Sequence, residues 1–327
     1  EINSVGFQET FQNFKTHLSH LRLMEEYIDK EKPDILFLVD YSGFNMFMAR
    51  LAAKKDIPAV NYFPPTAWIW GKWRAKWMAR TGVTIAAVFP MARNLYLEAG
   101  ANVEFVGHPL LDMINIEDSK SEIYNKLEVK PSRPIIGLLP GSRNSEINSL
   151  LPEMLKAAEK LQQKNEDIQF ILPLAGGIDT SRIYDQVSEY NLVIKIVENY
   201  THEVMKASDF LIAASGTATL EEAILKTPSI ILYKTSWLTY HLGKHLIKVD
   251  NVGMPNIIAN NEILPELLQN EAQADNIYKK ALDLLNKPYL MTGIVKKLEK
   301  VKEMLGEAGA IKRTAELVIN EGALENS

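Results

Sequence analysis

The stretch from Ile135 to Glu146, IIGLLPGSRNSE, constrains the fold more than any other part of this chain. Its first five residues form an apolar run, short enough for a strand that is buried on both faces, as in a parallel sheet. Pro140, Gly141 and Ser142 then break the strand, and a helical pattern resumes beyond them. The stretch therefore predicts a strand, a tight turn and a helix N-terminus in succession.

Arg143 lies at this turn, where the first backbone N–H groups of the helix lack intrahelical partners. Such an N-terminus is a ready anion site, but the helix dipole disfavours a cation there by roughly 0.3–1 kcal/mol. A negative group should therefore offset Arg143. Two candidates stay open: the side chain of Glu146 in the same turn, and the phosphate of a ligand.

A second stretch, residues 210–221 (FLIAASGTATLE), has the same strand–turn–helix pattern. Ser215, Gly216 and Thr217 offer two hydroxyls and an unhindered backbone at the helix N-terminus, which suits a diphosphate. Glu221 follows one turn later and could accept hydrogen bonds from the two hydroxyls of a ribose. This stretch is therefore a second candidate for nucleotide binding.

The alternative for the second stretch is purely structural. Thr219 and Glu222 could form a capping box, and Glu221 would then only complement the helix dipole. Either stretch alone is a weak indication. Two of them in one α/β unit favour a nucleoside diphosphate as the ligand.

Strands alternate with helices along all 327 residues, which predicts right-handed crossovers and mostly parallel sheets. The length suits two Rossmann-like domains, 1–112 and 113–327, divided near the polar stretch 115–132 and facing across a ligand cleft. We expect Pro152 at a helix start and helices from Leu264 onward, with the option that the C-terminal helices pack back on the first domain. The expected strands are 35–39, 59–63, 83–89, 103–106, 135–139, 168–173, 193–197, 209–214 and 229–233.

The composition excludes several classes of function. The net charge of −5 gives no sign of a nucleic-acid surface. Without cysteine the chain offers neither a disulfide framework nor a thiolate metal site, which suits the cytoplasm. No apolar run approaches the ~20 residues that span a bilayer, and no signal peptide is recognisable. No Asp-x-Asp ligand pair occurs, which fits a site without a metal, and we expect no cofactor.

The segment from Trp68 to Arg80, WIWGKWRAKWMAR, interleaves tryptophans with basic residues. Lys76 and Arg80 are four residues apart and share one helical face. Aromatic and basic side chains together suit a membrane interface or a lipid with a phosphate head group. We interpret Trp70, Lys76 and Arg80 as residues for a lipid acceptor or the membrane. The alternative is that the tryptophans pack in the core.

Six motifs of the chain resemble, in the same order, those of the lipid-A-disaccharide synthases, glycosyltransferase family 19. Single motifs of this kind are moderately specific, but six in order are a strong indication, and the similarity covers nearly the whole chain. They are VDYSGFN at 39–45, YFPPTAWIW at 62–70, VGHP at 106–109, LPGSRNSE at 139–146, ASGTATLE at 214–221 and MPNIIA at 254–259.

The resemblance implies the two-domain GT-B fold and a specific reaction in lipid A biosynthesis. The family transfers 2,3-diacylglucosamine from UDP-2,3-diacylglucosamine to 2,3-diacylglucosamine 1-phosphate with inversion, giving UDP and the β-1',6-linked disaccharide precursor. We therefore expect a cytoplasmic enzyme of a Gram-negative bacterium, peripheral on the inner face of the cytoplasmic membrane. The oligomeric state stays open, with a homodimer as one option.

Carried over by position, the motifs define a UDP-sugar site in which Asn256 would close the sugar side of the cleft. For Asn256 the alternative is a turn residue after Pro255. Leaving-group charge on UDP would be stabilised by Arg143 and two helix N-termini instead of a metal. The candidate UDP-sugar residues are Arg143, Glu146, Ser215, Gly216, Thr217, Glu221 and Asn256.

Two residues are candidates for catalysis. Asp40 matches an aspartate that looks essential in the family, and it directly follows an apolar strand, so we predict it as the general base for the acceptor hydroxyl. Its alternative is the N-cap of the next helix, a role that Ser42 could also fill. His108 competes as the base because a histidine titrates nearer neutrality, but it could be a hydrogen-bonded inter-domain histidine.

The chain departs from the family pattern at three places. The family opens with a strand and a GETSGD turn, and this chain starts after them, which we interpret as truncation because the first sheet would otherwise expose a bare edge. Gly43 replaces the second aspartate of the family's D-x-x-D-F-N run. Met91 and Ala92 stand where the family has a glutamate after Phe-Pro.

Rival functions stay open at this point. One rival is another UDP-GlcNAc enzyme of the same fold, either the peptidoglycan GlcNAc transferase or a UDP-GlcNAc 2-epimerase. Only the motifs at Asp40 and 62–70 distinguish the lipid-A-disaccharide synthases from these enzymes. A UDP-sugar or lipid-binding relative without catalysis is the rival from another class. Product formation from the two acylated sugars would distinguish an enzyme from such a binding protein.

Overall fold

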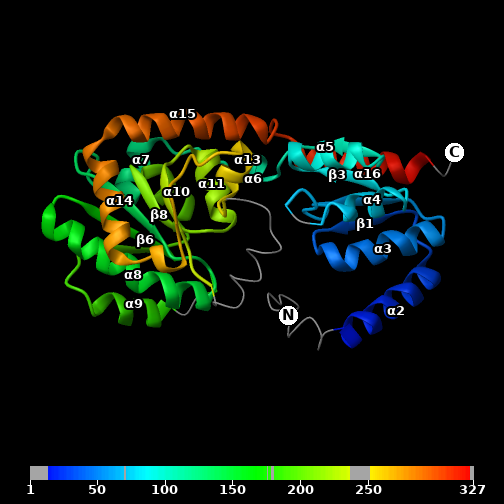
Figure 1. The fold of residues 1–327 in the computed structure, drawn as a ribbon, viewed down its shortest axis with the longest axis horizontal. Coiled ribbons are helices and arrows are strands. Elements are labelled where there is room, and N and C mark those ends of the chain that lie inside the picture. The colour runs from blue at the N-terminus through cyan, green and yellow to red at the C-terminus, as the bar shows by residue number, and fades with distance from the viewer. Residues whose placement is uncertain (1–13, 70, 175, 178–179, 236–250, 325–327) are drawn as a thin grey trace. The chain divides into compact units, whose positions relative to one another are not determined.

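The computed structural model describes residues 14–69, 71–174, 176–177, 180–235 and 251–324, with the backbone alone at 14–18. These residues form two compact units. The first contains the described residues up to Asp112 and those from Leu305 onward, and the second contains those between Met113 and Met304. Each unit has its own parallel sheet with helices packed on it (Figure 1).

In the first unit the described strands form one parallel sheet in the order β1-β2-β3-β4. Because every strand follows its neighbour in the chain, the carboxyl ends of all four lie at the same edge. The elements are α2 (Phe14–Glu31), β1 (Leu36–Val39), α3 (Ser42–Lys54), β2 (Ala59–Tyr62), α4 (Trp73–Ala79), β3 (Thr84–Ala87), α5 (Pro90–Glu98), β4 (Val103–Phe105), α6 (Leu110–Met113) and α16 (Ala310–Leu324).

The last helix, α16, packs on β2 of the first unit. Two polar contacts hold its start. The guanidinium Nε of Arg313 donates to the carbonyl of Val106 at 2.9 Å, and the carboxylate of Asp112 accepts from the backbone N–H of Ile311 at 2.8 Å. The chain therefore returns to its first sheet after completing the second unit.

In the second unit the described strands also form one parallel sheet, in the order β10-β9-β8-β5-β6-β7. The helices α8 and α14 pack together, as do α10 with α7 and α11 (Figure 1). The elements are α7 (Lys120–Lys126), β5 (Ile135–Leu139), α8 (Asn144–Lys164), β6 (Gln169–Leu174), α9 (Thr180–Ser188), β7 (Ile194–Glu198), α10 (Thr201–Ala207), β8 (Phe210–Ala214), α11 (Thr217–Leu225), β9 (Ser229–Tyr233), α13 (Met254–Ala259), β10 (Glu266–Leu268), the 3₁₀ turn η1 (Gln269–Glu271), α14 (Ala274–Asn286) and α15 (Pro288–Met304).

The strands β5 and β8 are neighbours at the centre of this sheet, with Leu139 opposite Ala213. Every residue of both strands is buried, as expected for apolar runs covered on both faces. From this pair the chain order runs outward in opposite directions, through β6 and β7 on one side and β9 and β10 on the other. Such a reversal is a topological switch point, where α/β proteins bind ligands beyond the carboxyl ends of the strands.

The expected strands are confirmed to within a few residues, but two expectations are wrong. Pro152 lies inside α8, because the turn after β5 already starts that helix, and it removes one intrahelical N–H donor there. The chain after Leu264 is not wholly helical, since β10 adds an edge strand next to β9. The helix expected around Leu242 lies outside the described residues.

Candidate functional site

The turn after β5 has the conformation that its sequence requires. Gly141 has a φ of +100°, which residues with a side chain rarely adopt, and a Cβ there would also require the carboxylate of Glu146 to move. Arg143 is the N-cap of α8 without a side-chain cap, and the N–H of Ile147 is bonded to its carbonyl at 3.0 Å. The amides before Ile147 lack intrahelical partners. Arg143 Nη1 lies 3.1 Å from Glu146 Oε1. This confirms Glu146 as a negative group that offsets the charge of Arg143.

The turn after β8 presents a second helix N-terminus. Gly216 is the N-cap of α11, again without a side-chain cap. The capping box with Thr219 as N-cap is wrong, because the helix starts at Thr217 and the Thr219 hydroxyl instead donates to the Gly216 carbonyl at 2.7 Å. The Ser215 hydroxyl donates to the carbonyl of Val252 at 3.1 Å. The hydroxyl of Thr217 is exposed.

Glu221 is paired with a residue that the sequence analysis missed. Its Oε2 lies 3.1 Å from Nε2 of His202, which stands on α10. This hydrogen bond is the main reason that the pKa of His202 is raised above its ordinary value. No local motif surrounds His202, and 19 residues separate the pair, so only the packing of α10 on α11 reveals it.

These side chains line one pocket of about 520 Å³ beyond the carboxyl ends of β5 and β8. Arg143 and His202 each lie beside a carboxylate within it, Glu146 and Glu221. Six of the seven predicted UDP-sugar residues are brought together here. The lining residues on which the argument depends are Gly141, Arg143, Glu146, His202, Ser215, Gly216, Thr217 and Glu221.

The seventh, Asn256, does not line this pocket. It is fully buried in the first turn of α13, so the alternative of a turn residue after Pro255 is wrong, and the role on the sugar side stays a prediction. Its Nδ2 donates to Leu264 O at 2.8 Å and to Glu266 Oε1 at 2.7 Å, and its Oδ1 accepts from the N–H groups of Ile263 and Leu264. All four hydrogen-bonding positions of the amide are therefore used within the protein.

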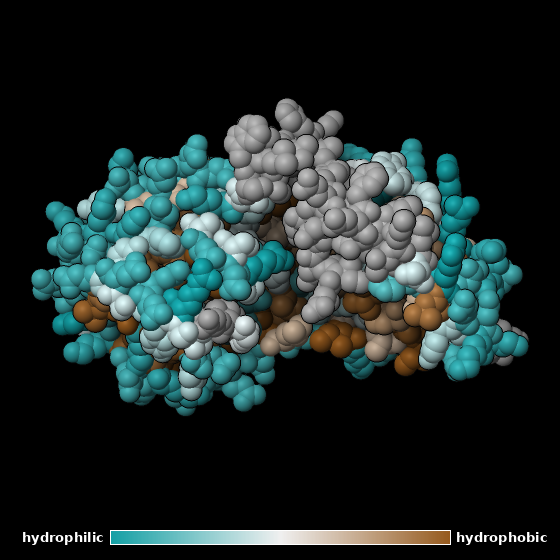
Figure 2. All heavy atoms as spheres, turned by 90° about the horizontal axis from the view of Figure 1, so that it is seen from below, coloured by the Kyte–Doolittle hydropathy of each residue, from teal (hydrophilic) through white to brown (hydrophobic). Residues whose placement is uncertain are grey.

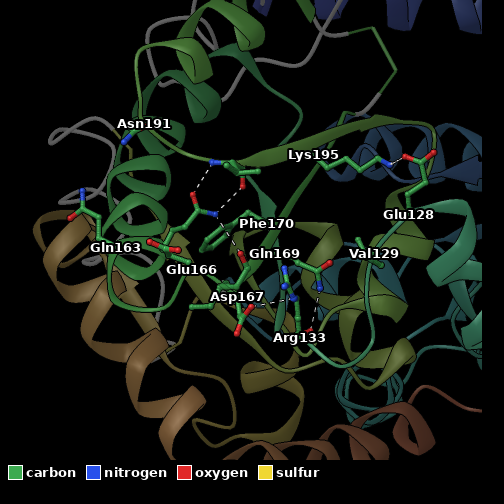
Figure 3. A pocket seen from close by; sticks show the side chains of 13 residues that line it. Glu128, Val129, Arg133, Gln163, Glu166, Asp167, Gln169, Phe170, Asn191 and Lys195 are labelled. Carbon is green, nitrogen blue, oxygen red and sulfur yellow. Dashed lines mark hydrogen bonds and ion pairs between the residues drawn. The ribbon is translucent and has the colours of Figure 1, made fainter.

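A second pocket of about 540 Å³ lies at the amino ends of β5, β6 and β7 (Figure 3). Four of the five charged side chains that line it form two pairs. Lys195 binds Glu128, and the Nε of Arg133 lies 3.2 Å from the carboxylate of Asp167. No predicted site residue is among those that line it.

Asp40 follows β1 in an unusual backbone conformation. Both Asp40 (φ +50°) and Tyr41 (φ +33°) are left-handed, which is strained for residues other than glycine. The N–H of Asp40 donates to Tyr62 O at 3.0 Å, and its carbonyl accepts from the amide of Asn45. Neither Asp40 nor Ser42 caps α3, because Tyr41 holds that position without a side-chain cap. The carboxylate of Asp40 is left exposed.

His108 is packed in the interior of the first unit. It is 4% exposed, and its ring lies 5.6 Å from that of Phe63 and 5.0 Å from that of Phe89. Its Nδ1 accepts from the backbone N–H of Leu110 at 3.2 Å. Burial lowers the pKa of His108 to about 4, so the ring is neutral at pH 7.

The basic and aromatic residues of α4 are divided between two faces. Trp73, Lys76 and Arg80 are exposed, whereas Arg74 is 5% exposed and faces the interior. Trp68 packs against the ring of Phe89 at 5.9 Å, as the core alternative predicts, and Trp70 lies outside the described residues. No described helix is both long enough and apolar enough to cross a membrane.

Two units that are each built on a parallel sheet, with a pocket at the switch point of the second, correspond to the GT-B fold class. Solved structures of this class have the same fold. A UDP-GlcNAc 2-epimerase from Neisseria meningitidis bound to UDP-GlcNAc aligns with a TM-score of 0.61 at 13% identity, covering 93% of this chain and 81% of that one. A glycosyltransferase from Rickettsia africae aligns with a TM-score of 0.56 at 18% identity, covering 100% and 85%.

The sequence comparisons define the family within that class. The lipid-A-disaccharide synthetase model matches residues 1–317. The lipid-A-disaccharide synthases of Geobacter sulfurreducens and Persephonella marina are 36% and 37% identical, over 98% and 97% of this chain and 83% and 85% of their own. The chain therefore belongs to the lipid-A-disaccharide synthase family and is a glycosyltransferase of lipid A biosynthesis. This confirms the predicted family, fold class and activity over the rival enzymes and the non-catalytic relative.

Proposed function

We propose that the chain transfers 2,3-diacylglucosamine from UDP-2,3-diacylglucosamine to the 6-hydroxyl of 2,3-diacylglucosamine 1-phosphate. The hydroxyl oxygen bonds to C1 of the donor sugar while the bond from C1 to the diphosphate breaks. UDP leaves with the electron pair, the hydroxyl proton passes to a base, and the new linkage is β-1',6. Membership of the family supports the reaction, and the pocket at β5 and β8 supports the mode of donor binding.

The observation that carries the donor site is the pairing of two helix N-termini with Arg143 in one pocket. The unpaired amides of α8 and α11 and the Thr217 hydroxyl would bind the diphosphate. Arg143 would exchange Glu146 for a phosphate oxygen, and this interaction grows as charge develops on the leaving group. Glu221 would accept from the ribose hydroxyls.

Asn256 fits a positioning role in this scheme. The carboxylate of Glu266, which Asn256 binds, also accepts from the N–H groups of Val252 and Gly253 at 2.9 Å. The carbonyl of Val252 in turn accepts from the Ser215 hydroxyl. Asn256 and Glu266 would therefore fix the backbone that orients Ser215, without contacting the ligand themselves.

Asp40 is the group we assign as general base for the acceptor hydroxyl. Its carboxylate is exposed at the end of a strand, while its backbone is held in a strained conformation by bonds on both sides. Strain of this kind is concentrated at functional sites. His108 is the weaker candidate, because its ring is 4% exposed between two aromatic rings and its Nδ1 is already bonded. We assign His108 to packing.

The test is the turnover of Asp40→Asn with the two acylated sugars. Loss of a positioned base costs ~10²–10⁴-fold in rate, and the affinity for UDP should not change. Asp34→Asn is the matched control, because Asp34 is an exposed aspartate before the same strand, and it should turn over normally. Normal turnover by Asp40→Asn together with an inactive His108→Ala would exchange the two roles.

We also propose that α4 meets the anionic inner face of the cytoplasmic membrane. Its exposed residues Trp73, Lys76 and Arg80 are spaced three and four apart and so share one helical face. The same unit exposes Phe37, Val39 and other apolar side chains, and Figure 2 has hydrophobic atoms at its surface. Aromatic and basic groups together suit a lipid interface.

Reversing the two charges of α4 tests the membrane contact. Each basic residue near an anionic surface contributes about 1 kcal/mol, so Lys76→Glu with Arg80→Glu should weaken binding to phosphatidylglycerol vesicles by about tenfold or more. Co-sedimentation measures it. Lys296→Glu with Lys300→Glu, on α15 of the second unit, is the control for net charge. Equal loss in both double variants would show that the effect is not specific to α4.

A further inference from the structure

The pocket contains a histidine, His202, to which the proposed donor site gives no role. We propose that His202 is a positioning residue for the nucleotide, which holds the carboxylate of Glu221 for the ribose hydroxyls and couples nucleotide binding to its own protonation. This inference rests on the proposed function, because it deepens the assignment of that same pocket to UDP.

The geometry links the two residues across separate elements. His202 on α10 and Glu221 on α11 both line the pocket, and their side chains are 36% and 20% exposed. His202 binds only Oε2. The described residues provide no hydrogen-bond partner for the other oxygen, so Glu221 has one oxygen fixed by the protein and one available to a ligand. A carboxylate held in this way loses less rotamer freedom when a ribose binds.

The protonation state of His202 sets the net charge of the pocket. Glu221 from α11 acts on it through the hydrogen bond, and Glu203 of its own helix acts through space, so the pKa of His202 is raised. On α7, Lys126 pairs with Asp118 instead, and the strands β5 and β6 beneath α10 carry no ionisable residue. Arg143, which also lines the pocket, pairs with the carboxylate of Glu146. The four charged groups of the pocket therefore sum to zero only while His202 is protonated.

The affinity of the pocket for UDP should therefore depend on pH. Below its raised pKa, His202 is a cation and the pocket is neutral before the ligand arrives. As the pH rises through that pKa, the proton leaves and Glu221 keeps an unbalanced negative charge. The affinity for the anionic UDP should then fall, because a like charge faces the diphosphate within the pocket.

Calorimetric titration with UDP at about pH 6 and about pH 8.5 tests the coupling. Relative to His202→Gln, which keeps a hydrogen-bond donor but no charge, the wild type should lose about threefold to tenfold more affinity between the two pH values. The ionisation of UDP itself affects both proteins equally, so it cancels in that ratio. His20→Gln, a histidine of α2 in the first unit, should behave like the wild type.

A second titration separates positioning from charge. Glu221 should make the protein prefer UDP over 2′-deoxy-UDP, and His202→Ala should reduce that preference by about threefold or more, while His202→Gln retains it. A preference unchanged in His202→Ala, with identical pH dependence in all variants, would overturn the proposal. Failure of the wild type to bind UDP at either pH would refute the proposed donor site, and this inference with it.

Discussion

The second unit has two pockets of nearly equal size on the same sheet, at opposite ends of its strands. The pocket at the carboxyl ends measures about 520 Å³ and the one at the amino ends about 540 Å³. Volume therefore gives no reason to prefer either as a binding site. The difference lies in what the backbone and the charged groups of each pocket leave available to a ligand.

At the amino ends, two glutamine side chains that line the pocket bond the backbone of the protein. The side-chain amide of Gln169 bonds both the N–H and the carbonyl of Lys130 at 2.8 Å, and that of Gln162 does the same for Val193 at 2.8 and 3.2 Å. At the carboxyl ends, α8 and α11 begin without side-chain caps. Helix N-termini without caps, facing one pocket, distinguish a ligand site from a surface hollow.

The largest effect we expect concerns Glu222 of α11, the helix whose N-terminus lines the carboxyl-end pocket. It is fully buried, and burial raises its pKa to about 8. In the folded state it therefore holds a proton between about pH 4.5 and pH 8 that the unfolded chain releases. Stability should fall as the pH rises through this window, and Glu222→Gln should remove a penalty of about 3 kcal/mol by pH 7.

Urea unfolding at pH 5.5 and pH 8.5 measures the difference between the wild type and Glu222→Gln. The matched control is Glu128→Gln in the amino-end pocket, whose carboxylate is exposed and has its pKa lowered by Lys195. Because that variant retains Glu222, its stability should fall with pH as in the wild type, and the difference between the two proteins should change little between the two pH values. A difference from the wild type that changes as much for Glu128→Gln as for Glu222→Gln would contradict the contrast between a buried carboxyl and an exposed pair.

The next largest effect concerns UDP affinity when one arginine of each pocket is replaced. Arg143 and Arg133 are both partly exposed and both paired with a carboxylate, at 3.1 and 3.2 Å. Arg143→Ala should weaken UDP binding by about 1.5–3 kcal/mol, the contribution of a charge-assisted hydrogen bond to a phosphate. Arg133→Ala should leave it unchanged. Calorimetry with UDP gives both values, and a similar loss in the two variants would remove the distinction between the pockets.

Much of the carboxyl-end pocket was predictable because its chemistry is local. In both stretches a short apolar run, a glycine turn and a helix start occupy consecutive residues, so sequence alone indicated two anion-type turns. Gly141 and the pairing of Arg143 with Glu146 depend on residues at most five apart. What the chain order does not reveal is that β5 and β8 are neighbours, since two strands and three helices separate them.

The remaining features depend on contacts between distant segments. His202 carries no motif, and its partner becomes apparent only when α10 packs on α11. β10 was missed because it has three residues and begins with a charge, Glu266, whose carboxylate is used to bind the backbone at Val252 and Gly253. Arg74 is one of the basic residues interleaved with the tryptophans, and nothing in that pattern indicated that it would be buried.

The central claim is that UDP binds beyond the carboxyl ends of β5 and β8 and not in the equally large pocket at the opposite edge. Hydrogen exchange of the whole chain with and without saturating UDP tests it most directly, because bound phosphates protect the amides they contact. We expect slower exchange at residues 140–147 and 215–221 and no change at 128–133 or 162–170. Protection at 128–133 and 162–170, with none at the two helix N-termini, would contradict the account.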